Sequence, residues 1–214
     1  MKRTGKKRIF VGAGFLAAFV LWTVLVSFVD VRAIGPNGSS VGFAALNGYV
    51  HKFTGVNFHL YTITDWLGLV PIGVALGFAI LGLVQWIKRK SLLKVDRSLL
   101  ALGGFYMVVL AAYIFFEIVV INYRPVLIDG YLEASYPSST TMLVMCVMPA
   151  AMMQLHERIK NRVFRRCVMV LIAVFMAFMV IGRLISGVHW FTDIVGGALL
   201  SAGLVMIYYS VSKK

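Results

Sequence analysis

The chain has 214 residues, of which 60% are hydrophobic and only 14% are charged, and its mean hydropathy is +0.88. A water-soluble domain of this length would carry far more charge, so the composition indicates an integral membrane protein. The formal net charge of +13 requires no nucleic-acid partner, because basic residues that set membrane topology and contact anionic lipid head groups account for it.

The apolar runs predict six membrane-spanning helices, and the length suits a single domain over residues 1–214. The predicted helices cover residues 9–29, 67–86, 99–121, 139–154, 167–185 and 191–211. The first follows a basic segment, as in a signal peptide. Its apolar stretch is too long, however, and no small-residue cleavage site follows, so we expect an uncleaved anchor. The predicted fold is therefore an all-α integral membrane protein, a six-transmembrane-helix bundle.

The segment between the first two predicted helices, residues 30–66, is too long for a simple turn. Phe43, Leu46, Val50 and Phe53 recur at helical spacing, so we expect a short helix that lies in the membrane interface. Such an element could frame a lateral entry for a lipid. A loop packed over the mouth of the bundle is an equally good interpretation.

Seventeen of the 21 basic residues fall on one side of the predicted bundle. They precede the first helix, connect the second helix to the third and the fourth to the fifth, and end the chain. By the positive-inside rule this side is cytoplasmic, so we expect both termini in the cytoplasm of a cell-membrane protein. The side that faces out of the cell then holds the other four basic residues, Arg32, Lys52, Arg124 and Arg183.

The most unusual stretch of the sequence is residues 182–193, which place Arg183, His189 and Asp193 among apolar residues. His189 and Asp193 are four residues apart, so on a helix they would share one face. A carboxylate in that position can fix the tautomer of the imidazole and stabilise its protonated form. Ionisable groups at membrane depth are costly, and this cluster therefore indicates a functional site.

Two further segments bring polar groups to the same side. Arg124 ends the third predicted helix, and the hydroxyl-rich sequence at 136–141 opens the fourth. Its hydroxyls are good N-caps, and the free backbone N–H groups of a helix start form an anion site. Two guanidiniums with backbone donors suit a phosphate or a phosphate ester, beside which His189 can act as a base or as a phosphoryl-accepting nucleophile. We therefore expect these groups, with Arg183, to converge on one phosphate-sized pocket.

Taken together, these residues resemble the type-2 phosphatidic acid phosphatase family of membrane lipid phosphatases. Its three signatures are K-x6-R-P, P-S-G-H and S-R-x5-H-x3-D. The third is matched at full spacing by Arg183, His189 and Asp193, with Gly182 in place of the serine. The six-helix plan, with the motifs on the third to sixth helices, also matches the family.

The first two signatures are altered in this chain. The first keeps its arginine as Arg124 but has Glu117 where the family has lysine. The second keeps its serine as Ser138 but has Ser139 and Thr140 where the family has glycine and histidine. Thr140 replaces the histidine that protonates the leaving group, and a hydroxyl is a poor acid near neutral pH. Glu117 would repel the phosphate that a lysine binds.

The resemblance also implies roles for the residues that match. His189 corresponds to the nucleophile that forms a phosphohistidine, and Asp193 to the residue that orients it. Arg124 and Arg183 correspond to phosphate ligands, and Ser138 to a phosphate donor. The neighbouring residues at 139–140 are expected to contact the substrate as well.

Three hypotheses about function remain open. In the first, the chain is a working lipid phosphatase or phosphotransferase that prefers a lipid diphosphate, such as a prenyl diphosphate, over a phosphatidate-like monoester. The leaving group of a monoester is an alkoxide, which requires a general acid. The leaving group of a diphosphate is a phosphate, which requires an acid much less. In the second, a different group is the acid, and Glu117 is the nearest candidate, because it lies seven residues before Arg124 on the same predicted helix face, where burial would keep it protonated. In the third, the chain binds, flips or transfers a phospholipid head group without hydrolysis.

The expected partners are the lipid phosphate or diphosphate substrate and the surrounding membrane lipids. No spacing of His, Cys, Asp and Glu in the sequence indicates a metal site, and we expect no cofactor. The sequence leaves the oligomeric state open.

Overall fold

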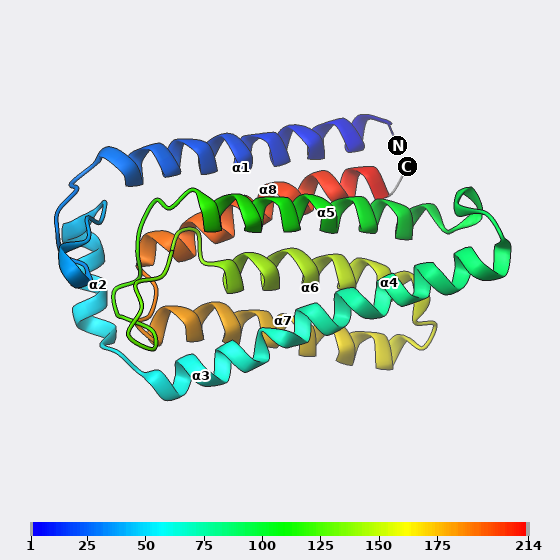
Figure 1. The fold of residues 1–214 in the computed structure, drawn as a ribbon. Helices are drawn as coiled ribbons and strands as arrows, with labels where there is room; N and C mark the ends of the chain where they lie inside the picture. The colour runs from blue at the N-terminus through cyan, green and yellow to red at the C-terminus, as the bar shows by residue number, and fades with distance from the viewer. Residues whose placement is uncertain (1, 213–214) are drawn as a thin grey trace.

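Residues 2–212, the part of the chain that the computed structural model describes, form a bundle of α-helices (Figure 1). Strand-like pairing within these residues is limited to three isolated bridges. The α-helices are α1 (Lys2–Phe28), α2 (Ala44–Thr54), α3 (Phe58–Leu67), α4 (Leu69–Arg89), α5 (Arg97–Ile118), α6 (Ser139–Arg158), α7 (Arg162–Ile185) and α8 (Phe191–Ser212). Two short 3₁₀ turns, Pro36–Gly38 and Leu92–Lys94, lie in the connections.

Five helical segments of the described residues are long and apolar enough to cross a membrane. They are Gly5–Phe28, Phe58–Arg89, Arg97–Ile118, Arg162–Ile185 and Phe191–Ser212. The predicted all-α membrane architecture is therefore confirmed, with five such helices where six were expected. The remaining helix, α6, packs against α4, α5, α7 and α8. Because protein surrounds α6, its surface does not need to be as apolar as that of a helix in contact with lipid.

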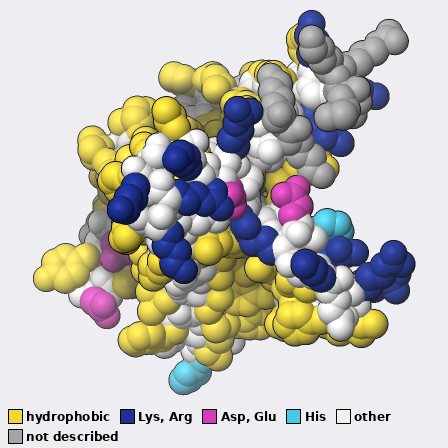
Figure 2. Space-filling view, turned by 90° about the vertical axis from the view of Figure 1, so that its right-hand side faces the viewer, with side chains coloured by type: hydrophobic (Ala, Val, Ile, Leu, Met, Phe, Trp, Pro, Cys, Tyr) yellow, Lys and Arg dark blue, Asp and Glu magenta, His cyan; other side chains and the backbone are white. Residues whose placement is uncertain are grey.

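The bundle has two chemically different ends. The start of α1, the end of α8 and the α4–α5 and α6–α7 connections lie at one end, which we call the basic end (Figure 1). Figure 2 views this end and shows Lys and Arg side chains spread over it. The helix α2, the irregular segment 119–138 and the α7–α8 connection lie at the other end, which we call the distal end. The candidate site residues Arg124, Arg183, His189 and Asp193 therefore lie at the distal end, opposite to the basic end.

The helix α8 is held against α1 by close approach of the two backbones. A Cβ atom on Gly12 would lie 2.8 Å from Ile207 Cγ1, and one on Gly203 would lie 2.7 Å from Leu16 Cδ2. Glycines at such crossings let membrane helices pack at short distance. The larger hydrophobic core lies between α1, α5, α6 and α8, and a smaller one lies between α6 and α7. At the start of α8, Trp22 Nε1 of α1 donates to the carbonyl of Thr192, the residue before Asp193, at 3.1 Å.

The third predicted helix ends earlier than expected. α5 stops at Ile118, so Arg124 lies in the irregular segment 119–138 and does not end a helix. The segment begins with three β-branched residues, and the proline after Arg124 disfavours helical backbone at that position. The Arg124 backbone N–H instead donates to the Glu133 carbonyl at 3.0 Å. The prediction that Glu117 and Arg124 share a helix face is therefore wrong.

The outer segment between α1 and α4 contains two helices where one was expected. The short helix predicted from apolar spacing is present as α2, at the distal end of the bundle (Figure 1). Two residues of the predicted stripe, Leu46 and Phe53, are 39% and 84% exposed. The second helix, α3, was not predicted. It meets α4 at Gly68, and together they form the candidate span Phe58–Arg89.

Candidate active site

His189 lies in the short connection between α7, which ends at Ile185, and α8, which begins at Phe191. Gly187 turns the chain there with a φ of +68°, and any side chain at this position would collide with the Gly55 carbonyl oxygen. The turn leaves His189 only 3% exposed. The imidazole is thus fixed at the distal end, beside the first turn of α8.

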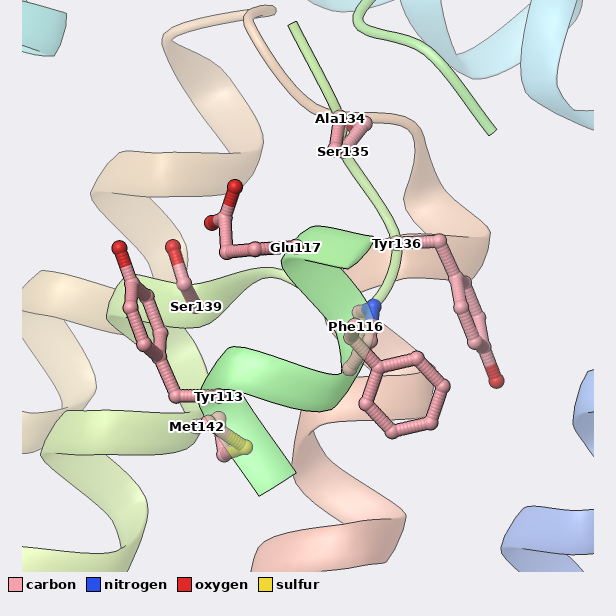
Figure 3. A pocket seen from close by; sticks show the side chains of 9 residues that line it. Tyr113, Phe116, Glu117, Ala134, Ser135, Tyr136, Ser139 and Met142 are labelled. Carbon is pink, nitrogen blue, oxygen red and sulfur yellow. The ribbon is translucent and has the colours of Figure 1, made fainter. Parts of the chain in front are cut away.

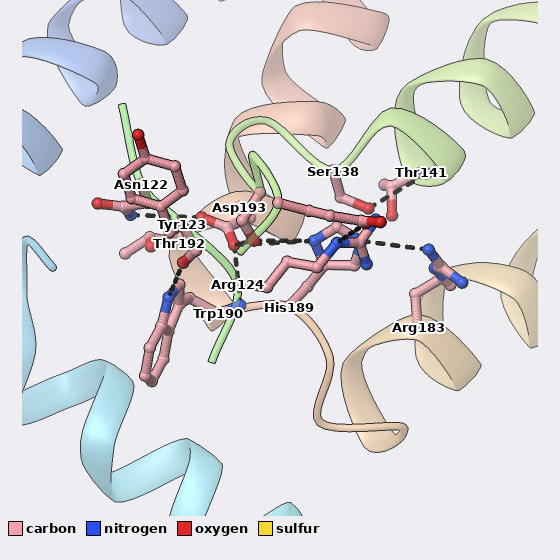
Figure 4. A network of polar contacts seen from close by, with 12 residues as sticks. Asn122, Tyr123, Arg124, Ser138, Thr141, Arg183, His189, Trp190, Thr192 and Asp193 are labelled. Atoms are coloured by element: carbon pink, nitrogen blue, oxygen red, sulfur yellow. Dashed lines mark hydrogen bonds and ion pairs between the residues drawn. The ribbon is translucent and has the colours of Figure 1, made fainter. Parts of the chain in front are cut away.

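Two guanidinium groups contact the same nitrogen of His189 (Figure 4). Arg124 Nη1 lies 3.4 Å and Arg183 Nη2 lies 3.3 Å from His189 Nε2. Both arginines are buried, with exposed fractions of 8% and 1%. A guanidinium can only donate hydrogen bonds, so Nε2 is the acceptor nitrogen of the ring. The convergence of Arg124, Arg183 and His189 that the sequence predicted is confirmed.

The other ring nitrogen is held through a serine that the sequence did not point to. His189 Nδ1 lies 3.1 Å from Ser135 Oγ, and Ser135 Oγ donates a hydrogen bond to Asp193 Oδ2. The distance from Nδ1 to Asp193 Oδ2 is 3.8 Å. Because Nε2 accepts, Nδ1 carries the ring hydrogen and donates it to Ser135. Asp193 therefore orients the ring largely through Ser135, since His189 precedes α8 and the two residues do not share a helical turn.

The Asp193 carboxylate is fully buried and needs several donors to remain there. The Trp190 backbone N–H donates to Oδ2 at 2.9 Å, and Asn122 Nδ2 donates to Oδ1 at 3.4 Å. The Asp193 carbonyl in turn accepts from the Ser138 backbone N–H at 3.0 Å. These bonds join the irregular segment 119–138 and the start of α6 to the first turn of α8 (Figure 4).

Burial lowers the pKa of His189 well below its ordinary value of 6.5. The positive charges of Arg124 and Arg183 lower this pKa further, and a hydrogen bond to Ser135 partly opposes them. The imidazole is therefore neutral at pH 7, with its lone pair on Nε2 between two guanidiniums. A neutral imidazole with an accessible lone pair is the form that a nucleophile requires.

We expect His189 in the ligand-free protein to stay neutral as the pH falls through 6.5 and to gain its proton only at lower pH. Burial and two neighbouring cations oppose the charged form, so more acid is needed to protonate the ring. NMR titration of ¹³C-labelled histidine, assigned with His189→Gln, measures the midpoint. Arg124→Gln should raise the midpoint because one opposing cation is removed. A midpoint at or above 6.5 in the unmodified protein would contradict the prediction.

Each arginine also has a carboxylate partner. Arg124 Nε lies 3.0 Å from Glu133 Oε2, and Arg183 Nη1 lies 3.5 Å from Asp65 Oδ1. The Tyr61 ring lies over both guanidiniums, with its centroid 6.0 Å from Arg124 Cζ and 5.0 Å from Arg183 Cζ. Arg183 Nε is buried and has no hydrogen-bond partner within the described residues. An unsatisfied donor at this depth is a position that an anion can fill.

The start of α6 adds backbone donors to the site. Ser138 caps the helix, as predicted, and its Oγ accepts from the Thr141 backbone N–H at 3.5 Å. The first N–H groups of a helix have no partner within it, so they are oriented toward ligands at its start. The Ser138 N–H already bonds to Asp193, so the donors offered to an anion come from Ser139 and Thr140. Both of these residues are half-buried.

Glu117 is placed differently from the expectation. None of the hydrogen bonds around His189 in the described part of the chain involves it, and it lines a small pocket with Tyr113, Ser135 and Ser139 (Figure 3). Figure 3 shows its carboxylate pointing the same way as the hydroxyls of Tyr113 and Ser139. The expected burial is wrong: Glu117 is exposed, because it lies in the last turn of α5. Its role as the acid stays a prediction.

Sequence reasoning missed four residues that border the site, namely Tyr61, Asp65, Asn122 and Ser135. Tyr61 and Asp65 carried a usable signal, an aspartate four residues after a tyrosine within an apolar run. Asn122 and Ser135 carried none, because side-chain directions in an irregular segment follow no period. Across residues 2–212, no group of three His, Cys, Asp or Glu side chains is arranged to hold a metal ion.

Comparison with known proteins relates this arrangement to one family. The family model of the PAP2 superfamily matches residues 100–214, more than half of the chain. The fold is similar to the crystal structure of a transmembrane PAP2-type phosphatidylglycerolphosphate phosphatase from Bacillus subtilis. The match has a TM-score of 0.51 and 20% sequence identity, and it covers 93% of each chain. No curated protein sequence matches the chain significantly.

Proposed function

This chain belongs to the PAP2 superfamily, and on that premise we propose that it hydrolyses or transfers the phosphate of a membrane lipid through a phosphohistidine on His189. The family and the shared fold support hydrolysis of lipid phosphates in general. The nucleophile, the preferred substrate and the orientation in the membrane are parts of this proposal.

One observation carries the proposal: His189 Nε2 lies between two buried guanidiniums, 3.4 Å from Arg124 and 3.3 Å from Arg183. A phosphate held by both arginines would lie against the Nε2 lone pair. The two positive charges would also stabilise the charge on the phosphoryl oxygens during transfer. The unsatisfied Nε of Arg183 supports anion binding at the same place.

In the proposed first step, the Nε2 lone pair attacks phosphorus. The bond from phosphorus to the leaving oxygen breaks, and its electron pair departs with that oxygen. The Nδ1 hydrogen remains directed at Ser135 and Asp193, which support the positive charge that the ring acquires. In the second step, water or an acceptor hydroxyl takes the phosphoryl group, and His189 recovers its lone pair.

A cavity of about 640 Å³ supports a lipid as the substrate. Asp65, Ser139 and Thr140 line it at the distal end, and largely apolar residues of α4, α5 and α6 line the rest. Such a cavity suits an amphiphile whose phosphate reaches the arginines while its hydrocarbon chain lies between the helices.

The membrane arrangement that we propose follows from charge and helix length. We assign α6 as the sixth crossing, because its 20 residues pack in the centre of the bundle among the candidate spans. We place the basic end in the cytoplasm, so that the site faces out of the cell at the surface of the cell membrane. The exposed Phe53 of α2 supports a position of that helix in the interface.

Phosphate release from a panel of lipid monophosphates and diphosphates tests the proposed function with the purified protein. We expect release, and a preference of about 10-fold or more for a diphosphate over the matching monophosphate. The reason is Thr140, whose hydroxyl cannot supply the proton that an alkoxide leaving group needs. Thr140→His should raise the monophosphate rate.

Two results would count against these expectations. Equal rates on the two substrate classes, with no response to Thr140→His, would show that Thr140 does not set the leaving-group requirement. Tight binding of lipid phosphates without release from any lipid would overturn hydrolysis and favour the alternative, a protein that binds, flips or transfers a phospholipid head group.

A further inference from the structure

The two arginine–carboxylate pairs of the site differ in what surrounds the carboxylate. Asp65, the partner of Arg183, lines the 640 Å³ cavity together with Ser139 and Thr140. Glu133, the partner of Arg124, comes from the irregular segment 119–138 and is absent from the lining of that cavity within the described residues. One carboxylate therefore faces the space that a lipid leaving group would occupy, and the other does not.

Asp65 is also joined to His189 through a single guanidinium. Arg183 Nη1 lies 3.5 Å from Asp65 Oδ1, and Arg183 Nη2 lies 3.3 Å from His189 Nε2. The helix α3, which carries Asp65, packs against α7, which carries Arg183. The carboxylate and the nucleophilic nitrogen thus contact the two terminal nitrogens of one buried guanidinium.

We propose that Asp65 is a catalytic residue, the general base that activates water for hydrolysis of the phosphohistidine on His189. This inference rests on the proposed function. It also assigns a role to α3, which lies outside the residues matched by the family model.

The place of Asp65 fits the order of the two steps. In an in-line displacement the entering and leaving groups occupy opposite sides of phosphorus. The side opposite to His189 Nε2 is first filled by the lipid leaving group and then by water. Asp65 and Thr140 line the cavity from which the lipid departs, so water entering there meets both. A carboxylate accepts a proton from water, whereas the Thr140 hydroxyl does not do so at neutral pH.

The step balances without any further reactant. The water oxygen forms a bond to phosphorus while the bond from phosphorus to Nε2 breaks and returns its electron pair to His189. The proton lost by water passes to the Asp65 carboxylate. The products are inorganic phosphate, a neutral imidazole and a protonated Asp65, whose side chain is 57% exposed and returns the proton to solvent.

The test separates formation of the phosphohistidine from its hydrolysis. The probe is farnesyl diphosphate with a ³²P label on its terminal phosphate, given to purified protein and quenched in alkali, which preserves phosphohistidine. We expect Asp65→Asn to form labelled enzyme as fast as the unmodified protein but to release phosphate about 100-fold more slowly, so that label accumulates. Asp30→Asn is the matched control: it neutralises an aspartate that also pairs with an arginine, Arg32, at 2.7 Å but outside the site, and its labelled enzyme should hydrolyse at the unmodified rate.

A rescue experiment distinguishes a base from a residue that only positions Arg183. In the Asp65→Asn background, Thr140→His should restore hydrolysis of the labelled enzyme, because an imidazole would then supply a base in the same cavity. Hydrolysis at the unmodified rate in Asp65→Asn would overturn the proposal, as would an equal slowing of formation and hydrolysis. Label that never appears on the unmodified protein, with no phosphate released, would overturn the proposed function and this inference with it.

Discussion

The His189→Ala variant should lose turnover almost completely, with phosphate release falling by about 10⁴-fold or more. The lone pair on Nε2 is the nucleophile in the proposed mechanism, and alanine leaves no group between Arg124 and Arg183 that can form a bond to phosphorus. Lipid phosphate binding should largely remain, since both guanidiniums stay. The measurements are phosphate release, ³²P labelling of the enzyme, and binding of a lipid phosphate by the same preparation.

His59→Ala is the matched control for this loss. His59 lies on α3 at the same end of the bundle, but it is exposed and forms none of the hydrogen bonds around His189 in the described part of the chain. Its replacement should leave turnover unchanged. Asp193→Asn should keep the geometry similar and lower the rate strongly, because support for the imidazolium is lost. Full turnover or normal labelling in His189→Ala would rule out the phosphohistidine route.

The parts of the fold that the sequence predicted are those where one strong signal decides the structure. Long apolar runs separated by basic clusters predicted the helices now seen as α1, α4, α5, α7 and α8 to within a few residues at most ends. In a membrane, backbone groups must be bonded within the segment, so such a run has no alternative to a helix. The helix α6 was predicted from an apolar run as well, at residues 139–154, and in the structure it packs against α4, α5, α7 and α8.

The site was only half predictable, for a related reason. Arg183 and His189 flank a short connection between two helices, so their proximity follows from sequence spacing. Arg124 lies in an irregular segment, and its position depends on backbone hydrogen bonds such as the one from the Arg124 N–H to the Glu133 carbonyl. Sequence spacing does not predict such bonds. Ser135 lies later in that segment, and no sequence pattern predicts that its hydroxyl contacts both His189 and Asp193.

The α3 helix, Phe58–Leu67, falls where the sequence predicts only one short helix, now seen as α2, in the segment between the first two predicted spans. Residues 58–67 are largely apolar but include two threonines and one aspartate, and the helix that they form has only 10 residues. Asn57 caps the helix by accepting from the Leu60 backbone N–H at 2.9 Å, a signal that was present in the sequence. With α3 in place, Tyr61 and Asp65 fall on one helix face, and that face covers the arginines of the site.

Arg183→Gln should lower kcat/KM by about 10²–10³-fold, the second largest loss that we expect. Arg183 contacts His189 and Asp65 through different nitrogens, so its removal takes away a phosphate donor and the link between the two. Arg183→Lys should restore only part of the rate, because an ammonium is a point charge and cannot make both contacts. The side chain is 1% exposed, so the variant should also lose roughly 1–3 kcal/mol of stability.

The comparison that isolates the function of Arg183 uses two further variants. Arg32→Gln removes an arginine that also pairs with an aspartate, at 2.7 Å from Asp30, but its side chain is 67% exposed, and we expect unchanged turnover. Arg124→Gln combined with Arg183→Gln should cost less than the product of the single losses, because both guanidiniums act on one anion. Losses that multiply would mean that the two arginines serve different steps. The measurements are kcat/KM and the inhibition constant of inorganic phosphate. If neither changes in Arg183→Gln, the substrate phosphate does not bind between Arg124 and Arg183.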